Sequence, residues 1–143
     1  MPTTFTQGPT VGDKFVHDFS FSDEQISEYA KISGDINPIH VSADYGKKSM
    51  FGKCIVHGYF SISIFSKIYG TLLYPEQHIL ISQTAKYLKP IFTNSNYTAV
   101  FIALEIIPHK HRVRYLNEII DKESGELKVT GEAILMNKKY YNW

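Results

Sequence analysis

The stretch YFSISIFSKIYGTLLY, residues 59–74, decides the fold, because its apolar side chains cover more than one helical face. A helix that is apolar nearly all round is typical of a buried position. The segment SISIF within it alternates and is β-branched, which is also typical of a strand. The length of the run and the absence of a turn inside it favour the helix. We therefore predict a long, buried central helix.

Four long strand-like runs follow this helix: HILISQTAKYLKPIF (78–92), NYTAVFIALEII (96–107), KHRVRYLNEII (110–120) and LKVTGEAILMNKK (127–139). DKESGE (121–126) is typical of a hairpin turn, and KFVHDFSF (14–21) has the weak alternation of a first strand. Because strands and helices do not alternate along the chain, the pattern predicts an α+β fold in which a curved antiparallel sheet wraps around the long central helix. A sheet this short leaves an edge strand, which pairing with a second copy would cover.

A shorter helix precedes the central one, over SDEQISEYAKISG (22–34). Ser22 and Gln25 form a capping box, and Gly34 suits a left-handed stop. The following SGDINPIH (33–40) contains an Asn-Pro step, and the residue before a proline avoids helical dihedrals. We therefore expect a bent loop rather than a helix here, and then a short helix over residues 42–48. The expected inner face of the first helix consists of Ile26, Tyr29, Ala30 and Ser33.

Composition limits the class of protein. The chain has 143 residues, 43% of them hydrophobic, so we predict a single domain over residues 1–143 with its core over about residues 11–138. Its formal net charge of +1 creates no field that would recruit nucleic acid or an anionic membrane. The lone Cys54 suits a reducing compartment, and we see neither a signal peptide nor an apolar run of the ~18–20 residues that span a membrane. We expect a cytoplasmic protein whose last five residues, 139–143, are loosely held.

Candidate functional residues gather in two short segments. Asp35, Asn37 and His40 lie in the expected bent loop, and His57 and Gly58 lie at the entry to the central helix. Unpaired N–H groups at a helix N-terminus can hold a carbonyl oxygen that gains negative charge, and glycine permits its close approach. A neighbouring aspartate and histidine could hold a water molecule between them. Together these groups suggest addition of water to, or hydrolysis of, an activated acyl group, although each side chain alone could be structural.

Residues 33–66, SGDINPIHVSADYGKKSMFGKCIVHGYFSISIFS, resemble the signature of the MaoC-like, or (R)-specific, enoyl-CoA hydratases, also called hydratase 2. They match D-x-N-P-x-H, then F-G-x-x-I-x-H-G, then a helix that carries a serine at Ser66. The later segments KYLKPIF and VTGEAIL are also similar to strands of this family. The resemblance implies the hot-dog fold, in which a curved antiparallel sheet wraps a long helix.

The resemblance also implies an activity: reversible syn addition of water to a trans-2-enoyl thioester of CoA or of a carrier protein, giving an (R)-3-hydroxyacyl thioester. By position, Asp35 and His40 would be the catalytic pair, and Gly58 would offer its backbone N–H to the thioester carbonyl. Asn37, Ser66 and His57 would support the site, His57 more as a structural brace than as a reacting group. No metal or redox cofactor is implied, and a homodimer with a pocket near the interface of its protomers is expected.

Several alternatives stay open. A hot-dog acyl-CoA thioesterase would cleave the thioester instead, and a non-catalytic acyl-thioester binding protein would do neither. The sequence does not choose between hydration and dehydration, or between CoA and carrier-protein substrates. Lys47, Lys48 and Lys53 would meet the phosphates of CoA, the acidic surface of a carrier protein, or only solvent. Tyr59 stands where many relatives have methionine, and its ring would narrow the acyl tunnel, which leaves the acyl chain length open.

Overall fold

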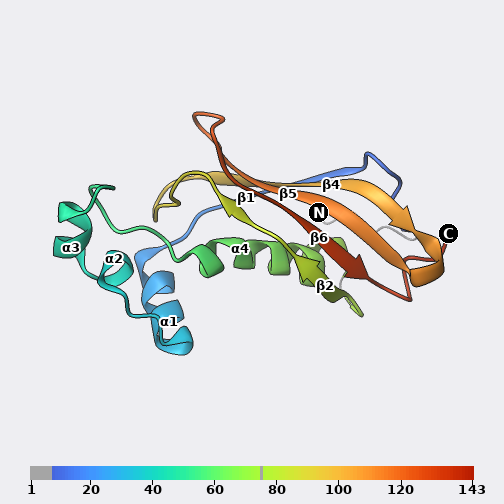
Figure 1. The fold of residues 1–143 in the computed structure, drawn as a ribbon, viewed down its shortest axis with the longest axis horizontal. Helices are drawn as coiled ribbons and strands as arrows, with labels where there is room; N and C mark the ends of the chain where they lie inside the picture. The colour runs from blue at the N-terminus through green and yellow to red at the C-terminus, as the bar shows by residue number, and fades with distance from the viewer. Residues whose placement is uncertain (1–7, 75) are drawn as a thin grey trace.

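The computed structural model describes residues 8–74 and 76–143, and its main element is one antiparallel sheet (Figure 1). Along the sheet the strands follow the order β1-β4-β5-β6-β2, and the short β3 also pairs with β6. The strands are β1 (Lys14–Phe19), β2 (Ile79–Gln83), β3 (Lys86–Tyr87), β4 (Tyr97–Ile107), β5 (Arg112–Asp121) and β6 (Leu127–Met136). The predicted hairpin turn over residues 121–126 joins β5 to β6, and a short 3-10 helix, η2 (Pro108–Lys110), joins β4 to β5.

The central helix lies against one face of this sheet (Figure 1). It begins as α4 (Gly58–Lys67) and continues as the π-helical turn η1 (Ile68–Leu73), which confirms the predicted helix over the strand alternative. Its sheet-facing side chains, including Ile64, Phe65 and Ile68, belong to the hydrophobic core. The helix is not buried all round, however: Tyr59 is 82% exposed. The apolar pattern therefore marks two faces, of which this chain covers one.

The run over residues 78–92 was predicted as one strand, and this was wrong. It forms β2 and β3, separated by Thr84 and Ala85, which pack directly against the backbone of Gly131. The Thr84 N–H donates to the Glu132 carbonyl at 2.8 Å, so the break is held against β6. Sequence periodicity cannot locate this break, because it depends on a glycine some 47 positions further along the chain.

Three helices gather at the end of the sheet where α4 begins (Figure 1): α1 (Asp23–Ser33), α2 (Pro38–Val41) and α3 (Ala43–Lys48). In α1 the capping box is present as predicted, and Gly34 ends the helix with a φ of 79°. Ile26 and Ala30 are buried as expected, whereas Ser33 is exposed. No described helix has both the length and the apolar character that crossing a membrane requires.

Candidate active site

The end of α1 places Asp35. Because Gly34 adopts the left-handed conformation, the chain turns sharply away from the helix axis, and the Asp35 N–H donates to Ser33 Oγ at 3.1 Å. One carboxylate oxygen, Oδ1 of Asp35, accepts the N–H of Asn37 at 3.2 Å. This side-chain-to-backbone turn fixes the carboxylate and leaves its other oxygen, Oδ2, free for a second partner.

His40 lies in the one-turn helix α2, not in the bent loop that the Asn-Pro step predicted. Pro38 is the first helical residue, where its fixed φ suits the helix and its missing N–H costs nothing. Asn37 caps this turn, since its Oδ1 accepts the Ile39 N–H at 3.2 Å. Asn37 is thus the helix cap of the turn that carries His40.

A backbone carbonyl sets the tautomer of His40. Its Nδ1 lies 2.8 Å from the Ile55 carbonyl oxygen, which can only accept, so Nδ1 carries the proton. Its Nε2 then presents a lone pair and lies 3.9 Å from Asp35 Oδ2. That separation is too long for a direct hydrogen bond, but one water molecule can bridge it. The His40 side chain is 11% exposed and that of Asp35 is 50% exposed, so the pair opens to one side.

His57 contacts the segment that carries Asp35 and His40. It is buried, its Nε2–H donates to the backbone carbonyl of Asp35 at 2.9 Å, and its ring stacks on that of His40 with the centroids 4.0 Å apart. Tyr29 packs edge-on against the His57 ring, with the centroids 4.8 Å apart. His57 therefore contacts both Asp35 and His40 directly. Its Nδ1 is buried and has no hydrogen-bond partner among the described residues.

One polar atom each from Asp35, His40 and His57 lies within 4.8 Å of the others, a spacing that raises the question of a metal ion. The two imidazole planes are inclined by only 26° and stacked. Nitrogen lone pairs lie in the ring plane, so those of two stacked rings cannot converge on one ion at the ~2.0–2.1 Å that zinc requires. The arrangement does not fit a metal centre and fits a water-binding pair instead.

The N-terminus of α4 forms the second half of the site. His57 is its N-cap residue without a side-chain cap bond, and Gly58 is its first residue, so the N–H groups of this turn have no intrahelical partner. A side chain at position 58 would begin 3.2 Å from the ring of Tyr87. Glycine avoids this tight contact, and the N–H groups at this end of α4 can donate to an acceptor next to His57, which contacts both Asp35 and His40.

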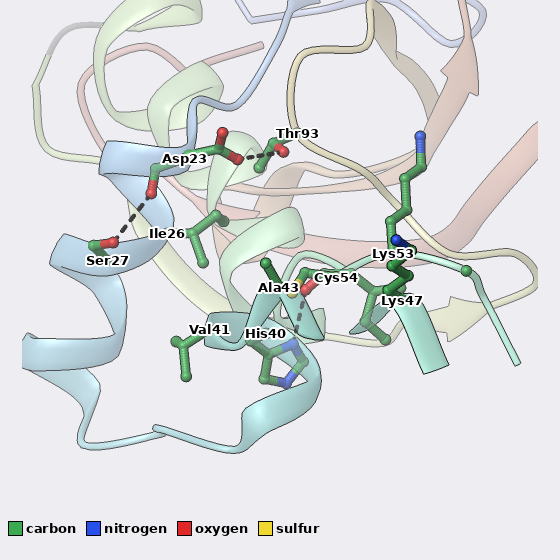
Figure 2. Close-up of a pocket in the computed structure, with 12 residues that line it drawn as sticks. Asp23, Ile26, Ser27, His40, Val41, Ala43, Lys47, Lys53, Cys54 and Thr93 are labelled. Atoms are coloured by element: carbon green, nitrogen blue, oxygen red, sulfur yellow. Dashed lines mark hydrogen bonds between the residues drawn. The ribbon is translucent and has the colours of Figure 1, made fainter. Parts of the chain in front are cut away.

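Two hollows share Ile55 as a lining residue; His40 lines one and Gly58 lines the other, whereas Asp35 lines neither. One, of about 550 Å³, lies between α1 and the segment from His40 to Ile55, and His40 lines it (Figure 2). Lys47 and Lys53 also line it, whereas Lys48 does not. The other, of about 260 Å³, is bounded by Ile55, Gly58 and Tyr87. Ligand-sized space therefore reaches His40 from one hollow and Gly58 from the other, and Ile55 borders both.

Ser66 is the predicted site residue that this chain does not bring to the pair. It lies eight positions after Gly58 on α4, about 12 Å along the axis, and is exposed. Its hydroxyl makes no hydrogen bond to any described residue. Sequence reasoning also missed two contributors: the Ile55 carbonyl, which no side-chain pattern can reveal, and Tyr87, whose only signal was its place in the family-like segment KYLKPIF.

Comparison with known proteins agrees with this geometry. The (R)-specific enoyl-CoA hydratase of Aeromonas caviae is 28% identical over 129 residues, which are 90% of this chain and 96% of the relative. The 3-hydroxyacyl-(acyl-carrier-protein) dehydratase FERN of Solanum lycopersicum is 30% identical over 82% of this chain and 70% of its own length. A solved structure of an (R)-hydratase from A. caviae superposes with a TM-score of 0.85, covering 92% of this chain and 98% of that one.

A helix wrapped by an antiparallel sheet, with polar groups at the helix N-terminus, places the protein in the hot-dog class, as the sequence predicted. The family model described as "MaoC like domain" matches residues 6–122 of this chain. The chain belongs to this MaoC-like family.

Proposed function

We propose that this protein is an (R)-specific enoyl-thioester hydratase, which in the reverse direction is a 3-hydroxyacyl-thioester dehydratase. The observation that carries the proposal is the Asp35–His40 pair, separated by 3.9 Å beside the open N-terminus of α4. Its relatives support the reaction class, since they are named as a hydratase of enoyl-CoA and a dehydratase of carrier-protein thioesters.

The pair holds the water that reacts. Because Nδ1 of His40 is committed to the Ile55 carbonyl, both facing atoms, His40 Nε2 and Asp35 Oδ2, accept hydrogen bonds. A water between them donates one hydrogen to each, which turns its oxygen lone pairs outward toward the substrate. The water oxygen bonds to C3 and the π electrons move toward the thioester oxygen. The pair takes one proton from the water and delivers one to C2 on the same face, so its own proton count is restored.

Gly58 stabilises the charge that this step creates. Its backbone N–H, at the positive end of α4, donates to the thioester oxygen as that oxygen becomes enolate-like. Asn37 and His57 position the catalytic pair through the helix cap and the hydrogen bond to the Asp35 carbonyl. Ser66 supports the site only through the substrate or a second subunit, because it is exposed in the single chain.

A homodimer is part of the proposal. The strands β2 and β3 form one edge of the sheet, and Ile79, Leu80 and Ile81 on that edge are exposed. An apolar edge strand is a template for pairing, and a second copy would also cover the exposed face of α4 that carries Tyr59. A pocket near the protomer interface follows from this arrangement.

The test mixes the purified protein with crotonyl-CoA, and in parallel with crotonyl-carrier protein, and follows the absorbance of the conjugated thioester. We expect rapid loss and formation of (R)-3-hydroxybutyryl thioester. Release of free thiol would instead identify a thioesterase, and binding without turnover of either substrate would identify a non-catalytic acyl-thioester binder.

A further inference from the structure

Tyr87 lies between two hollows beside Gly58, the residue proposed to bind the thioester carbonyl. Besides the hollow of about 260 Å³, a second hollow of about 450 Å³ adjoins the start of α4. The two hollows share two lining residues, Gly58 and Tyr87. A thioester whose carbonyl is held at Gly58 extends from there in two directions, along its acyl chain and along its thiol arm. Tyr87 therefore bounds the space available to the acyl chain.

One hydrogen bond and close packing against Gly58 hold the ring in this position. The Tyr87 hydroxyl donates to the Gly58 carbonyl at 2.9 Å, and the ring lies 3.2–3.3 Å from the place where a Cβ on Gly58 would be. Ser61 donates to the same carbonyl at 2.7 Å, so the first turn of α4 is held from two sides. Burial, with the neighbouring Tyr59 and Tyr29 phenols, raises the pKa of Tyr87, which keeps the hydroxyl protonated as a donor.

The surroundings of the ring are suited to hydrocarbon. The smaller hollow is lined mostly by apolar side chains, namely Phe51, Ile55, Val56, Leu88, Pro90 and Ile91. The larger one adds Ile62, Ala85 and Tyr59, together with the amide side chain of Gln83. The ring of Tyr87 lies on the boundary that the two hollows share, so its removal would enlarge the apolar space beside Gly58.

We propose that the aromatic ring of Tyr87 sets the acyl chain length that this enzyme accepts, by dividing the apolar space on the two sides of Gly58. The inference rests on the proposed hydratase function and adds a specificity-determining residue to it. The ring acts by excluding volume, and the hydroxyl acts separately by holding the ring and the first turn of α4. These two roles are separable by substitution.

The experiment compares kcat/KM for crotonyl-CoA and trans-2-octenoyl-CoA in the wild type, Tyr87→Ala and Tyr87→Phe. Each methylene that moves from water into an apolar hollow raises the binding constant roughly fourfold. We expect the octenoyl-to-crotonyl ratio to rise at least about tenfold in Tyr87→Ala and to stay within about twofold in Tyr87→Phe, which keeps the ring. Tyr45→Ala, an equal truncation of a half-exposed tyrosine on α3 outside both hollows, controls for general effects and should leave the ratio unchanged.

Failure of this inference differs from failure of the proposed function. If the wild type hydrates crotonyl-CoA but the ratio in folded Tyr87→Ala equals that of the wild type, the inference is overturned and the hydratase stands. If neither the wild type nor any variant turns over substrate, the inference is tested by measuring the binding of butyryl-CoA and octanoyl-CoA by calorimetry. A shift of relative affinity toward octanoyl-CoA in Tyr87→Ala alone supports the inference, and equal affinity ratios in all variants overturn it.

Discussion

His40 has one nitrogen free for chemistry, because the other donates its proton to the Ile55 carbonyl at 2.8 Å. Asp35 is similarly divided: Oδ1 accepts the Asn37 N–H, and Oδ2 faces His40. Each side chain thus uses one polar atom for its own orientation, and in the proposed mechanism the other atom binds the shared water. The residue types and their order were predictable from D-x-N-P-x-H, whereas the atom-by-atom division was not, since it depends on backbone groups brought close by folding.

Replacing the Asp35 carboxylate tests this division. Asp35→Asn keeps the shape and can still accept through one oxygen, but it cannot take a proton from water. We expect kcat for crotonyl-CoA to fall by about 10²–10⁴-fold with little change in thermal stability. Glu28→Gln, a similar neutralisation on the exposed side of α1, should keep wild-type turnover. Wild-type activity in Asp35→Asn would contradict the mechanism.

At the scale of elements, the helix ends determine where the site residues lie. The capping box of α1 and the left-handed Gly34 were predicted because each is decided by residues within one or two turns. The helix α2 was missed for a different reason. A proline argues against helix for the residue before it, yet it is well suited to the first helical position, and here Asn37 takes the cap.

Two glycine-to-alanine substitutions separate strain from propensity. Gly34 has a φ of 79°, so alanine there should lower the free energy of unfolding by about 1–2 kcal/mol. Gly34→Ala should also reduce turnover, because the turn at Gly34 sets the position of Asp35. Gly70 lies on the exposed side of η1 and has nothing near its Cβ position. Gly70→Ala should therefore raise the free energy of unfolding by up to about 1 kcal/mol. Urea denaturation measures both values, and equal effects at the two positions would refute the conformational argument.

At the scale of the whole molecule, a buried polar cluster ties the C-terminal segment to the far end of the central helix. His78 donates from Nδ1 to the Tyr69 carbonyl and accepts from the Tyr141 hydroxyl at 2.7 Å. Tyr141 is fully buried, although residues 139–143 were expected to be loosely held. Terminal position alone predicts looseness, and only the packing of the tyrosine against this cluster overrides it.

This cluster predicts how stability depends on pH. Burial lowers the pKa of His78 below its ordinary value of 6.5, with the hydrogen bond to Tyr69 opposing part of the effect. The unfolded chain therefore binds the proton more readily, so the contribution of His78 is complete above about pH 6.5 and is lost as the pH falls toward the folded value. We expect the loss to reach at most about 1.4 kcal/mol per pH unit.

The measurement is urea denaturation between pH 5 and 7.5 at fixed protein concentration, for the wild type and His78→Gln. The variant should be less stable at neutral pH and should have a flatter acid limb. His109→Gln, in the exposed η2, is the matched control. An acid limb of unchanged slope in His78→Gln would assign the pH dependence to other groups.

The sheet edges predict assembly. Leu80 on β2 is 51% exposed and Val16 on β1, at the opposite edge, is 54% exposed. We expect Leu80→Lys to shift the protein toward monomers in analytical ultracentrifugation, since a charge at an apolar pairing edge opposes association, and Val16→Lys to stay dimeric. Dimer loss with Val16→Lys alone would move the interface to the other edge.

The sequence by itself determined what depends on near neighbours: the apolar run of the central helix, the caps of α1, the strand-forming runs and the signature that holds Asp35 and His40. Only the tertiary structure decided what depends on distant contacts. These are the break between β2 and β3, the Ile55 carbonyl on His40, the contact of His57 with Asp35 across 22 positions, and the ring of Tyr87 on Gly58. The physical reason is that periodicity and caps act over one or two turns of chain, whereas the position of a reacting atom is set by packing between segments that meet only in the fold.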